Sequence, residues 1–401
     1  MSKDSAVKVP KVRFKAFEET WADEKIGDVL TEKRRSILLK DNERYELITV
    51  KRRNEGIVSR GHLLGRDILV KNYAQLQTGD FVISNRQVVH GATGIVPPEL
   101  DGAIVSNEYL VAVSNDKLLT EFLTLIARLP AMRRKFFLSS YGVDIEKLFF
   151  DDEDWKKRDV TIPRVVEQTR ISEFFRELNR LLALHQHKHN KLVTLKKAML
   201  QKMFPQPGTT TPEIRFNGFS GAWEEKSLEQ TGTFNPKEVL PEVFEYVDLE
   251  SVVGTEMVNH RTETKKTAPS RAQRLARQGD LFFQTVRPYQ KNNHLFRLPD
   301  TNYVFSTGYA QIRPFNDGSF LLALMQRDQF VKVVLENCTG TSYPAINANV
   351  LAKILVMTPC PEEQEKIGTY FRTLDELISQ HATQLQKLQQ IKSACLEKMF
   401  V

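Results

Sequence analysis

The sequence predicts an α+β protein built as a tandem duplication, in which each half contains a strand-rich domain followed by one long helix. Three observations predict this class. Short motifs recur at a nearly constant distance along the chain, and one 42-residue segment of the first half aligns without a gap on a segment of the second. Both aligned segments carry apolar residues at steps of three and four, a spacing that is typical of paired helices.

Both halves open on the same motif. Pro10, Arg13, Phe14, Phe17 and Trp21 recur as Pro212, Arg215, Phe216, Phe219 and Trp223, all displaced by 202 positions. Further along, Gly79-Asp80 recurs as Gly279-Asp280 at a displacement of 200. Only two copies exist, so the pattern indicates a duplication and not a solenoid. The repeated aromatic residues are of the types most often found in protein cores, and we expect them there.

The two long helices are expected over residues 163–204 and 359–400, which share 17 identical positions at a displacement of 196. No Pro or Gly interrupts 164–204, and Pro163 and Pro359 mark the entries. The apolar spacing defines a seam along which helices can pair. The predicted seam residues are Ile171, Phe175, Leu178, Leu182, Leu192 and Leu195 in the first helix, and Ile367, Phe371, Leu374, Ile378, Leu385, Leu388 and Ile391 in the second.

Three histidines, His185, His187 and His189, lie close together in the first helix. His185 and His189 share one helical face, and such a pair can bind zinc. No Glu follows His185, however, and Leu385 stands where His189 would recur. We therefore interpret these histidines as polar seam positions and expect no metal site.

The strand-rich regions consist of short β-type runs separated by Gly, Asn and Pro turns. Strands are expected at 68–70, 81–83, 103–105 and 110–113, and again at 281–283, 303–305 and 354–357, with a helix at 117–137. Residues 205–212 are rich in Pro and Thr, which predicts a linker between the two halves. We expect a first domain over 1–160, a first helical spacer over 161–206, a second domain over 207–358 and a second spacer over 359–401.

Composition favours a globular protein that binds an anionic partner. Hydrophobic residues make up 41% and charged residues 27% of the chain. No apolar run reaches the ~18–20 residues that cross a bilayer, and the first residues lack signal-peptide features. Three cysteines without a C-x-x-C pair fit a reducing compartment, so we expect a cytoplasmic protein and no membrane partner. The net charge of +7 and pI of about 9.1 favour a nucleic acid.

Basic and polar side chains gather in the strand-rich regions. Lys and Arg neutralise phosphates, and Arg, Asn and Gln can pair with base edges. The candidate DNA-binding residues are Lys51, Arg52, Arg53, Arg60, Arg66, Asn85, Arg86 and Gln87 in the first domain, and Lys265, Lys266, Arg271, Arg274, Arg287, Tyr289, Lys291, Thr341 and Tyr343 in the second. Residues 261–291 hold eight basic residues and two acidic ones, which favours DNA contact for this cluster as a whole. For any single residue a solvated surface position is the alternative, and the 339–343 loop is equally consistent with a plain turn.

Motifs of catalysis are missing from the sequence. We find no G-x-G-x-x-G after a strand, no N-P-P-[FY] of amino-methyltransferases and no P-D…E-x-K nuclease spacing. We therefore expect no catalytic residue, no cofactor and no metal. Two other classes of function stay open: a self-contained DNA-modifying enzyme with a divergent active site, and a scaffold that assembles proteins through its coiled coil.

The repeated motifs resemble those of the specificity subunits of type I restriction–modification systems. They include P-x-[VI]-R-F-x-x-F-x-x-x-W at the start of each half, E-E-Q-x-K-I at 362–367, and the segments 200–205, 279–289 and 304–309. The resemblance spans essentially the whole chain, although the lead-in to the first helix at 164–168 lacks the usual second proline and full acidic pair.

This resemblance implies a fold and a mechanism. Two target-recognition domains would alternate with two long helices that pair as an antiparallel coiled coil with pseudo-two-fold symmetry, which holds the domains at a fixed distance. Each domain would read one half of a split double-stranded DNA target. Two methyltransferase (M) subunits and restriction/translocase (R) subunits would dock around this frame, and the specificity subunit itself would be non-catalytic.

Overall fold

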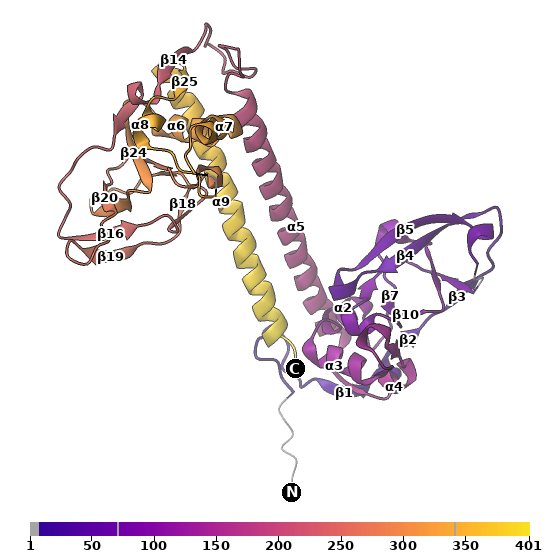
Figure 1. Ribbon diagram of the computed structural model, residues 1–401. Helices are drawn as coiled ribbons and strands as arrows, with labels where there is room; N and C mark the ends of the chain where they lie inside the picture. The colour runs from indigo at the N-terminus through magenta and orange to yellow at the C-terminus, as the bar shows by residue number, and fades with distance from the viewer. Residues whose placement is uncertain (1–7, 70–71, 341) are drawn as a thin grey trace. The chain divides into compact units, whose positions relative to one another are not determined.

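The computed structural model describes residues 8–69, 72–340 and 342–401, and the chain forms two compact units. One unit comprises residues 1–184 and 385–401, and the other comprises residues 185–384. The long helices α5 (Val165–Lys202) and α9 (Pro361–Lys398) are unbroken (Figure 1). The division between the units falls within both helices, so each unit contains one end of each.

The first unit is built on two sheets. The five-stranded sheet has the order β3 (Arg35–Ile37), β6 (Tyr73–Gln75), β9 (Ile104–Ser106), β4 (Arg44–Val50) and β5 (Ile57–Leu64). Its strands pair antiparallel except β4 and β9, which are parallel. The four-stranded antiparallel sheet has the order β2 (Thr31–Glu32), β10 (Tyr109–Val113), β7 (Phe81–Ser84) and β8 (Thr93–Ile95).

Short elements complete this unit. They are the pair β1 (Ala22–Lys25) and β13 (Asp159–Ile162), the pair β11 (Ser140–Tyr141) and β12 (Phe149–Phe150), and the helices α1 (Ile26–Val29), α2 (Thr120–Ile126), α3 (Pro130–Leu138) and α4 (Asp152–Lys156).

The second unit repeats the plan. One four-stranded sheet has the order β19 (Arg261–Thr264), β16 (Val243–Val247), β23 (Tyr303–Ser306) and β20 (Ala272–Leu275), with β16 and β23 parallel. The other has the order β15 (Gly232–Phe234), β24 (Tyr309–Pro314), β21 (Leu281–Gln284) and β22 (His294–Leu295). The pairs β14 (Glu224–Ser227) with β25 (Leu355–Thr358) and β17 (Val252–Val253) with β18 (Glu256–Met257), and the helices α6 (Gly318–Met325), α7 (Asp328–Glu336) and α8 (Ala348–Ala352), complete it.

The local predictions differ from the structure in two places. Ile68 and Leu69 form no strand. The N–H of Ile68 closes the 3-10 turn Gly65–Asp67 by donating to the carbonyl of Gly65 at 3.3 Å, and Val70 lies outside the described residues. The helix expected at 117–137 is interrupted before Pro130, which has no N–H to donate and occupies the first turn of α3. Within the described ranges, no helix combines the length and apolar composition needed to cross a bilayer.

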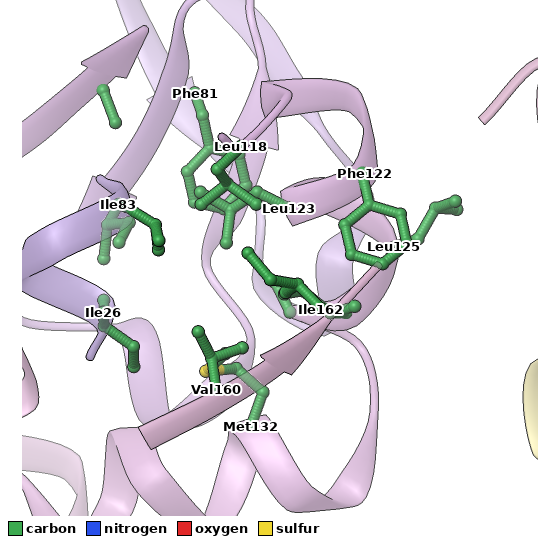
Figure 2. Packing of buried hydrophobic residues seen from close by; sticks show 14 of the residues in the cluster. Ile26, Phe81, Ile83, Leu118, Phe122, Leu123, Leu125, Met132, Val160 and Ile162 are labelled. Carbon is green, nitrogen blue, oxygen red and sulfur yellow. The ribbon is translucent and has the colours of Figure 1, made fainter. Parts of the chain in front are cut away.

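Each unit has a core that lies between one sheet and the long helices; this sheet contains β7 and β10 in the first unit and β21 and β24 in the second. In the first unit, side chains from β7, α2, α3 and β13 converge in this core (Figure 2). Phe175 of α5 and Met399, just beyond α9, belong to the same cluster. In the second unit the two helices exchange places: Phe371 of α9 belongs to the core cluster, and Met199 near the end of α5 packs against that cluster. The start of each helix therefore packs against the end of the other, which makes the pair antiparallel and agrees with the expected fold class.

The repeated opening motif anchors the start of each long helix. Arg13 donates two hydrogen bonds of 2.7 Å to Glu167, and Arg215 donates bonds of 2.8 and 2.7 Å to Glu363. The backbone N–H of Val12 donates to the carbonyl of Lys398 at 2.9 Å. In the other copy the backbone N–H of Ile214 donates to the carbonyl of Lys202, also at 2.9 Å. Both tryptophans of the motif are buried, as expected.

The repeated Gly-Asp pair also has a structural role. Asp80 is buried and accepts a hydrogen bond from the backbone of Gln77 at 2.8 Å and one from Arg35 at 2.6 Å. Asp280 likewise accepts from the backbone of Arg277 at 2.9 Å and from Arg313. In both units the carboxylate closes the turn that leads into the central strand of a sheet, which explains why the pair recurs.

The predicted seam residues have graded exposure. Ile171, Phe175, Leu178, Ile367, Phe371, Leu374 and Leu385 are buried, whereas Leu182, Leu192, Ile378 and Leu388 are half-buried. Leu195 and Ile391 are 37% and 47% exposed, so the structure departs from the expected seam at these two equivalent positions. The next residues, Lys196 and Lys392, turn toward the partner helix instead: Lys196 pairs with Asp375, and Lys392 donates to Asn179.

Candidate nucleic-acid interface

Two of the predicted basic segments meet in the first unit. Arg52 and Asn54 lie in the turn between β4 and β5, where Arg53 and Asn54 have positive φ values of 60° and 55°. The Asn54 N–H donates to the carbonyl of Gly91 at 2.8 Å, and Arg52 Nε donates to Gln87 Oε1 at 2.8 Å. The β4–β5 turn therefore lies against the segment that follows β7.

Ion pairs divide the basic side chains of this surface into two groups. Arg52 pairs with Glu146 at 2.9 Å, and Arg86 pairs with Glu108 at 2.8 Å. Lys51, Arg53, Arg60 and Arg66 are exposed, and the described residues offer them no ion-pair partner. Asn85 is half-buried, and its Oδ1 atom is buried without a donor. The unpaired cations are the ones free to meet phosphates.

The second unit has a basic group around the connection between β19 and β20. Lys265 pairs with Glu242 at 2.8 Å, whereas Lys266 and Arg271 are exposed and have no such partner among the described residues. Arg274 lies on β20 with its Nε atom buried and without an acceptor. Burial without a nearby carboxylate lowers the pKa of Arg274 from its ordinary value. An anion that reached this guanidinium would satisfy it.

A second group surrounds the 3-10 turn Pro288–Gln290. Arg287 and Lys291 bracket this turn with positive φ values of 54° and 57°, which non-glycine residues rarely adopt. The Arg287 N–H donates to the carbonyl of Pro344 at 2.8 Å, and its guanidinium lies 4.5 Å from the ring centre of Tyr343. The 285–291 and 342–346 segments thus form one edge, on which Tyr289 and Tyr343 are half or more exposed.

Two residues of this edge differ from the rest of the candidate set. Lys291 donates to the carbonyl of Gln326 at 2.8 Å and pairs with Asp328 at 2.5 Å, so its charge is already engaged. Thr341 lies outside the described residues. In the ranges that the structure covers, no group of three His, Cys, Asp or Glu side chains is placed to hold a metal ion.

The sequence marks the basic segments but not their acidic partners. Glu146 lies 94 positions from Arg52, and Lys265 and Lys291 meet Glu242 and Asp328. These contacts depend on the folded arrangement and leave no local pattern. One pair of partners is visible in the sequence because both members are repeated: Arg13 and Glu167 recur in the second half as Arg215 and Glu363.

Comparisons with known proteins agree with this architecture. A family model described as the type I restriction modification DNA specificity domain matches residues 18–194 and 272–390. The type I restriction enzyme HindI specificity subunit of Haemophilus influenzae is 26% identical over 163 residues, covering 39% of this chain and 35% of that protein. The match thus spans about a third of the length of that relative.

Solved structures resemble the chain over nearly its whole length. A crystal structure of the type I restriction–modification system S subunit from M. genitalium has a TM-score of 0.55 at 13% identity, covering 98% of this chain and 99% of that one. The HsdS subunit of Thermoanaerobacter tengcongensis has a TM-score of 0.45 at 18% identity, covering 95% and 96%.

Proposed function

This chain belongs to the type I restriction–modification DNA specificity family, and we propose that it is the subunit that reads a bipartite DNA target. In this proposal it supplies no catalytic residue. It directs two M subunits, and in the full complex the R subunits, to the site. The observation that carries the proposal is that the family match falls in both halves of the chain, each of which presents a strand-rich domain with unpaired basic side chains.

We assign the reading to residues 1–160 and 207–358, and the spacing to residues 161–206 and 359–401. The proposed phosphate- and base-contacting groups are those without an ion-pair partner among the described residues. They are Lys51, Arg53, Arg60, Arg66, Lys266, Arg271, Arg274 and Arg287, with Tyr289 and Tyr343 beside them. Lys and Arg would supply salt-dependent affinity, and the polar groups of the turns would meet base edges.

Co-expression with the M subunit of the same system tests the function. Methylated bases are mapped across the genome of a host that lacks other modification systems. The expected result is one motif of two short half-sites separated by an unread gap, which disappears when this chain is omitted. The purified chain alone, incubated with DNA and S-adenosylmethionine, should transfer no methyl group. Methylation independent of this chain, or turnover by the chain alone, would overturn the proposal.

A further inference from the structure

A basic cavity of about 680 Å³ lies in the second unit. Its walls are the last turns of α5, the segment that follows that helix, Lys291, and the turn between α6 and α7. The charged lining residues are the cations Lys196, Lys197, Lys202, Lys291 and Arg327 and the anions Glu213 and Asp328. The cavity thus collects positive charge from segments that are distant in the sequence.

Ion pairs neutralise only part of this charge. Lys196 pairs with Asp375, Lys202 pairs with Glu213 at 2.6 Å, and Lys291 pairs with Asp328 at 2.5 Å. Lys197 and Arg327 have no ion-pair partner among residues 8–69, 72–340 and 342–401. Two positive charges at the cavity wall therefore lie outside the ion pairs, although Lys197 is close enough to Asp328 to contribute to the lowered pKa of that carboxyl.

The guanidinium of Arg327 is held in place by neutral groups. It lies 4.8 Å from the ring centre of Phe204, and its Nη2 atom donates to the carbonyl of Pro205 at 3.0 Å and to Gln329 Oε1 at 2.9 Å. Burial lowers the pKa of Arg327 to about 10, because no carboxylate in the part of the chain that the structure describes offsets the loss of water. Its Nε and Nη1 atoms have no acceptor in the described part of the chain, and they remain available to an anion.

We propose that this cavity binds one phosphate group of the DNA backbone, an inference that rests on the proposed function. The cavity wall includes Lys291, the residue that closes the turn bearing Arg287 and Tyr289, so it adjoins the candidate DNA edge. Because Nη2 of Arg327 is already engaged, one remaining N–H of its guanidinium and the Lys197 ammonium would each donate to a non-bridging oxygen of a phosphodiester. Neutralising a desolvated guanidinium adds a favourable contact that a solvated lysine does not offer.

The first unit has no counterpart of Lys197, and the buried guanidinium of its corresponding turn, Arg128, donates to the carbonyl of Asn54 at 3.1 Å. Ser393 stands at the position of α9 that corresponds to Lys197, and Leu129 precedes α3 where Arg327 precedes α7. The proposed phosphate contact therefore belongs to one half of the protein only. It should affect the phosphates on one side of the bipartite target and leave the other side unchanged.

The test uses the complex with M subunits and a duplex that contains the mapped target. Affinity is measured over a range of salt concentrations for wild type, Lys197→Ala, Arg327→Gln and the control Lys191→Ala, an exposed position on the same helix outside the cavity. Lys197→Ala and Arg327→Gln should each weaken binding about threefold to tenfold and reduce the salt slope by about one phosphate contact. Lys197→Ala changes an exposed side chain, so the test stands even if Arg327→Gln does not fold.

A neutral-phosphate scan identifies the ligand. Methylphosphonate is placed at each position of the duplex in turn. At one position the methylphosphonate should weaken binding by wild type more than binding by Lys197→Ala, because the variant has already lost the lysine contact and keeps only that of Arg327. Unchanged salt slopes, or methylphosphonate losses of equal size in wild type and Lys197→Ala at every position, would show that no backbone phosphate enters the cavity.

Two other results would also overturn the inference. Competition by inorganic phosphate at constant ionic strength, without a sensitive duplex position, would assign the cavity to free phosphate. Weaker association of Lys197→Ala with M subunits, at an unchanged salt slope, would assign it to a carboxylate of the partner. Neither outcome contradicts the proposed function, which fails only if the wild-type complex methylates no bipartite target.

Discussion

The Nζ atom of Lys392 donates a hydrogen bond of 2.7 Å to Oδ1 of Asn179, joining α9 to α5 in the first unit. The equivalent residues of the second unit are Lys196 and Asp375, which form an ion pair. The duplication has therefore conserved the geometry and changed the charge. Burial and the nearby Arg128 lower the pKa of Lys392, and no carboxylate of the described residues offsets them.

Asn179→Asp should stabilise the first unit. The new carboxylate would face Lys392 and raise its lowered pKa, adding about 0.5 kcal/mol, the value of a well-placed but partly exposed pair. Asp375→Asn is the matched reverse change and should cost a similar amount in the second unit. Both are measured by urea denaturation near neutral pH. An Asn179→Asp protein no more stable than Asn179→Ala would show that the pairing geometry is not as described.

Removing one partner of the Arg13–Glu167 pair should lower the free energy of unfolding far more than the Asp375→Asn change does. The two side chains are 11% and 3% exposed, so Glu167→Gln leaves the buried guanidinium without its counter-charge. We expect a loss of about 3 kcal/mol from the first unit. The control is Glu43→Gln in the surface pair with Lys40, which should leave the unfolding midpoint unchanged. Equal midpoints for both variants would contradict a framework role for the repeated Arg.

The contact between His185 and His381 should make helix pairing sensitive to pH. Their Nδ1 atoms lie 2.9 Å apart, and burial, His185, Lys188 and His189 lower the pKa of His381. The folded state disfavours the charged form of His381. The stabilisation that the neutral His381 provides is therefore present above the unfolded-state pKa of about 6.5, and it is lost as the pH falls through the lower pKa of the folded state.

Thermal unfolding between pH 7.5 and pH 5 checks this expectation. Wild type should lose stability over this interval, whereas His381→Leu should lose less. His187→Ala, an exposed position on α5, serves as the control and should behave as wild type. A pH profile of His381→Leu that is parallel to wild type would assign the titration to other groups.

Internal pairing should decide which basic residues bind DNA. The triple change of Arg271, Arg274 and Arg287 to Ala removes cations without an ion-pair partner among the described residues, and should weaken DNA binding and flatten its salt dependence. The matched triple of Arg261, Lys265 and Arg277 removes cations that pair with Asp248, Glu242 and Glu238, and should have a smaller effect. Salt slopes measured on the complex distinguish the two. Equal slopes for both triples would mean that pairing does not predict contact.

The C-terminal helix should tolerate direct fusion to the opening motif. Phe400 packs on Trp21 with ring centres 6.2 Å apart, as Phe204 packs on Trp223 at 5.8 Å. If Val401 is joined to Met1, the connection between Phe400 and Pro10 consists of Val401 and residues 1–9. This is longer than residues 205–211, which connect the equivalent Phe204 and Pro212. A permutant opened between Gly208 and Thr209 should fold and direct methylation to the original motif. A folded permutant with a different or lost motif would contradict this equivalence.

The long helices and the duplication could be predicted because their signals are local or are repeated in linear order. Steps of three and four mark the helical face, and 17 identities over the aligned segments mark the copies. The observed seam is rotated slightly from the predicted one. The 3.5-residue spacing predicts Leu195 in the seam, whereas Lys196 is the residue that turns inward, since a straight helix drifts by roughly 20° per heptad from a 3.5-residue repeat.

The sequence by itself determined the duplicated α+β plan, the two helices and the basic character of the strand-rich regions. The tertiary structure alone decided which of those cations are free. Arg52 and Arg271 look alike in the sequence, yet the fold brings Glu146 to the first and no carboxylate in the described residues to the second. It also leaves Arg327, which no sequence pattern singled out, at the wall of a cavity. The physical reason is that burial and charge pairing are set by contacts between residues far apart in the chain, whereas helical periodicity is set by near neighbours.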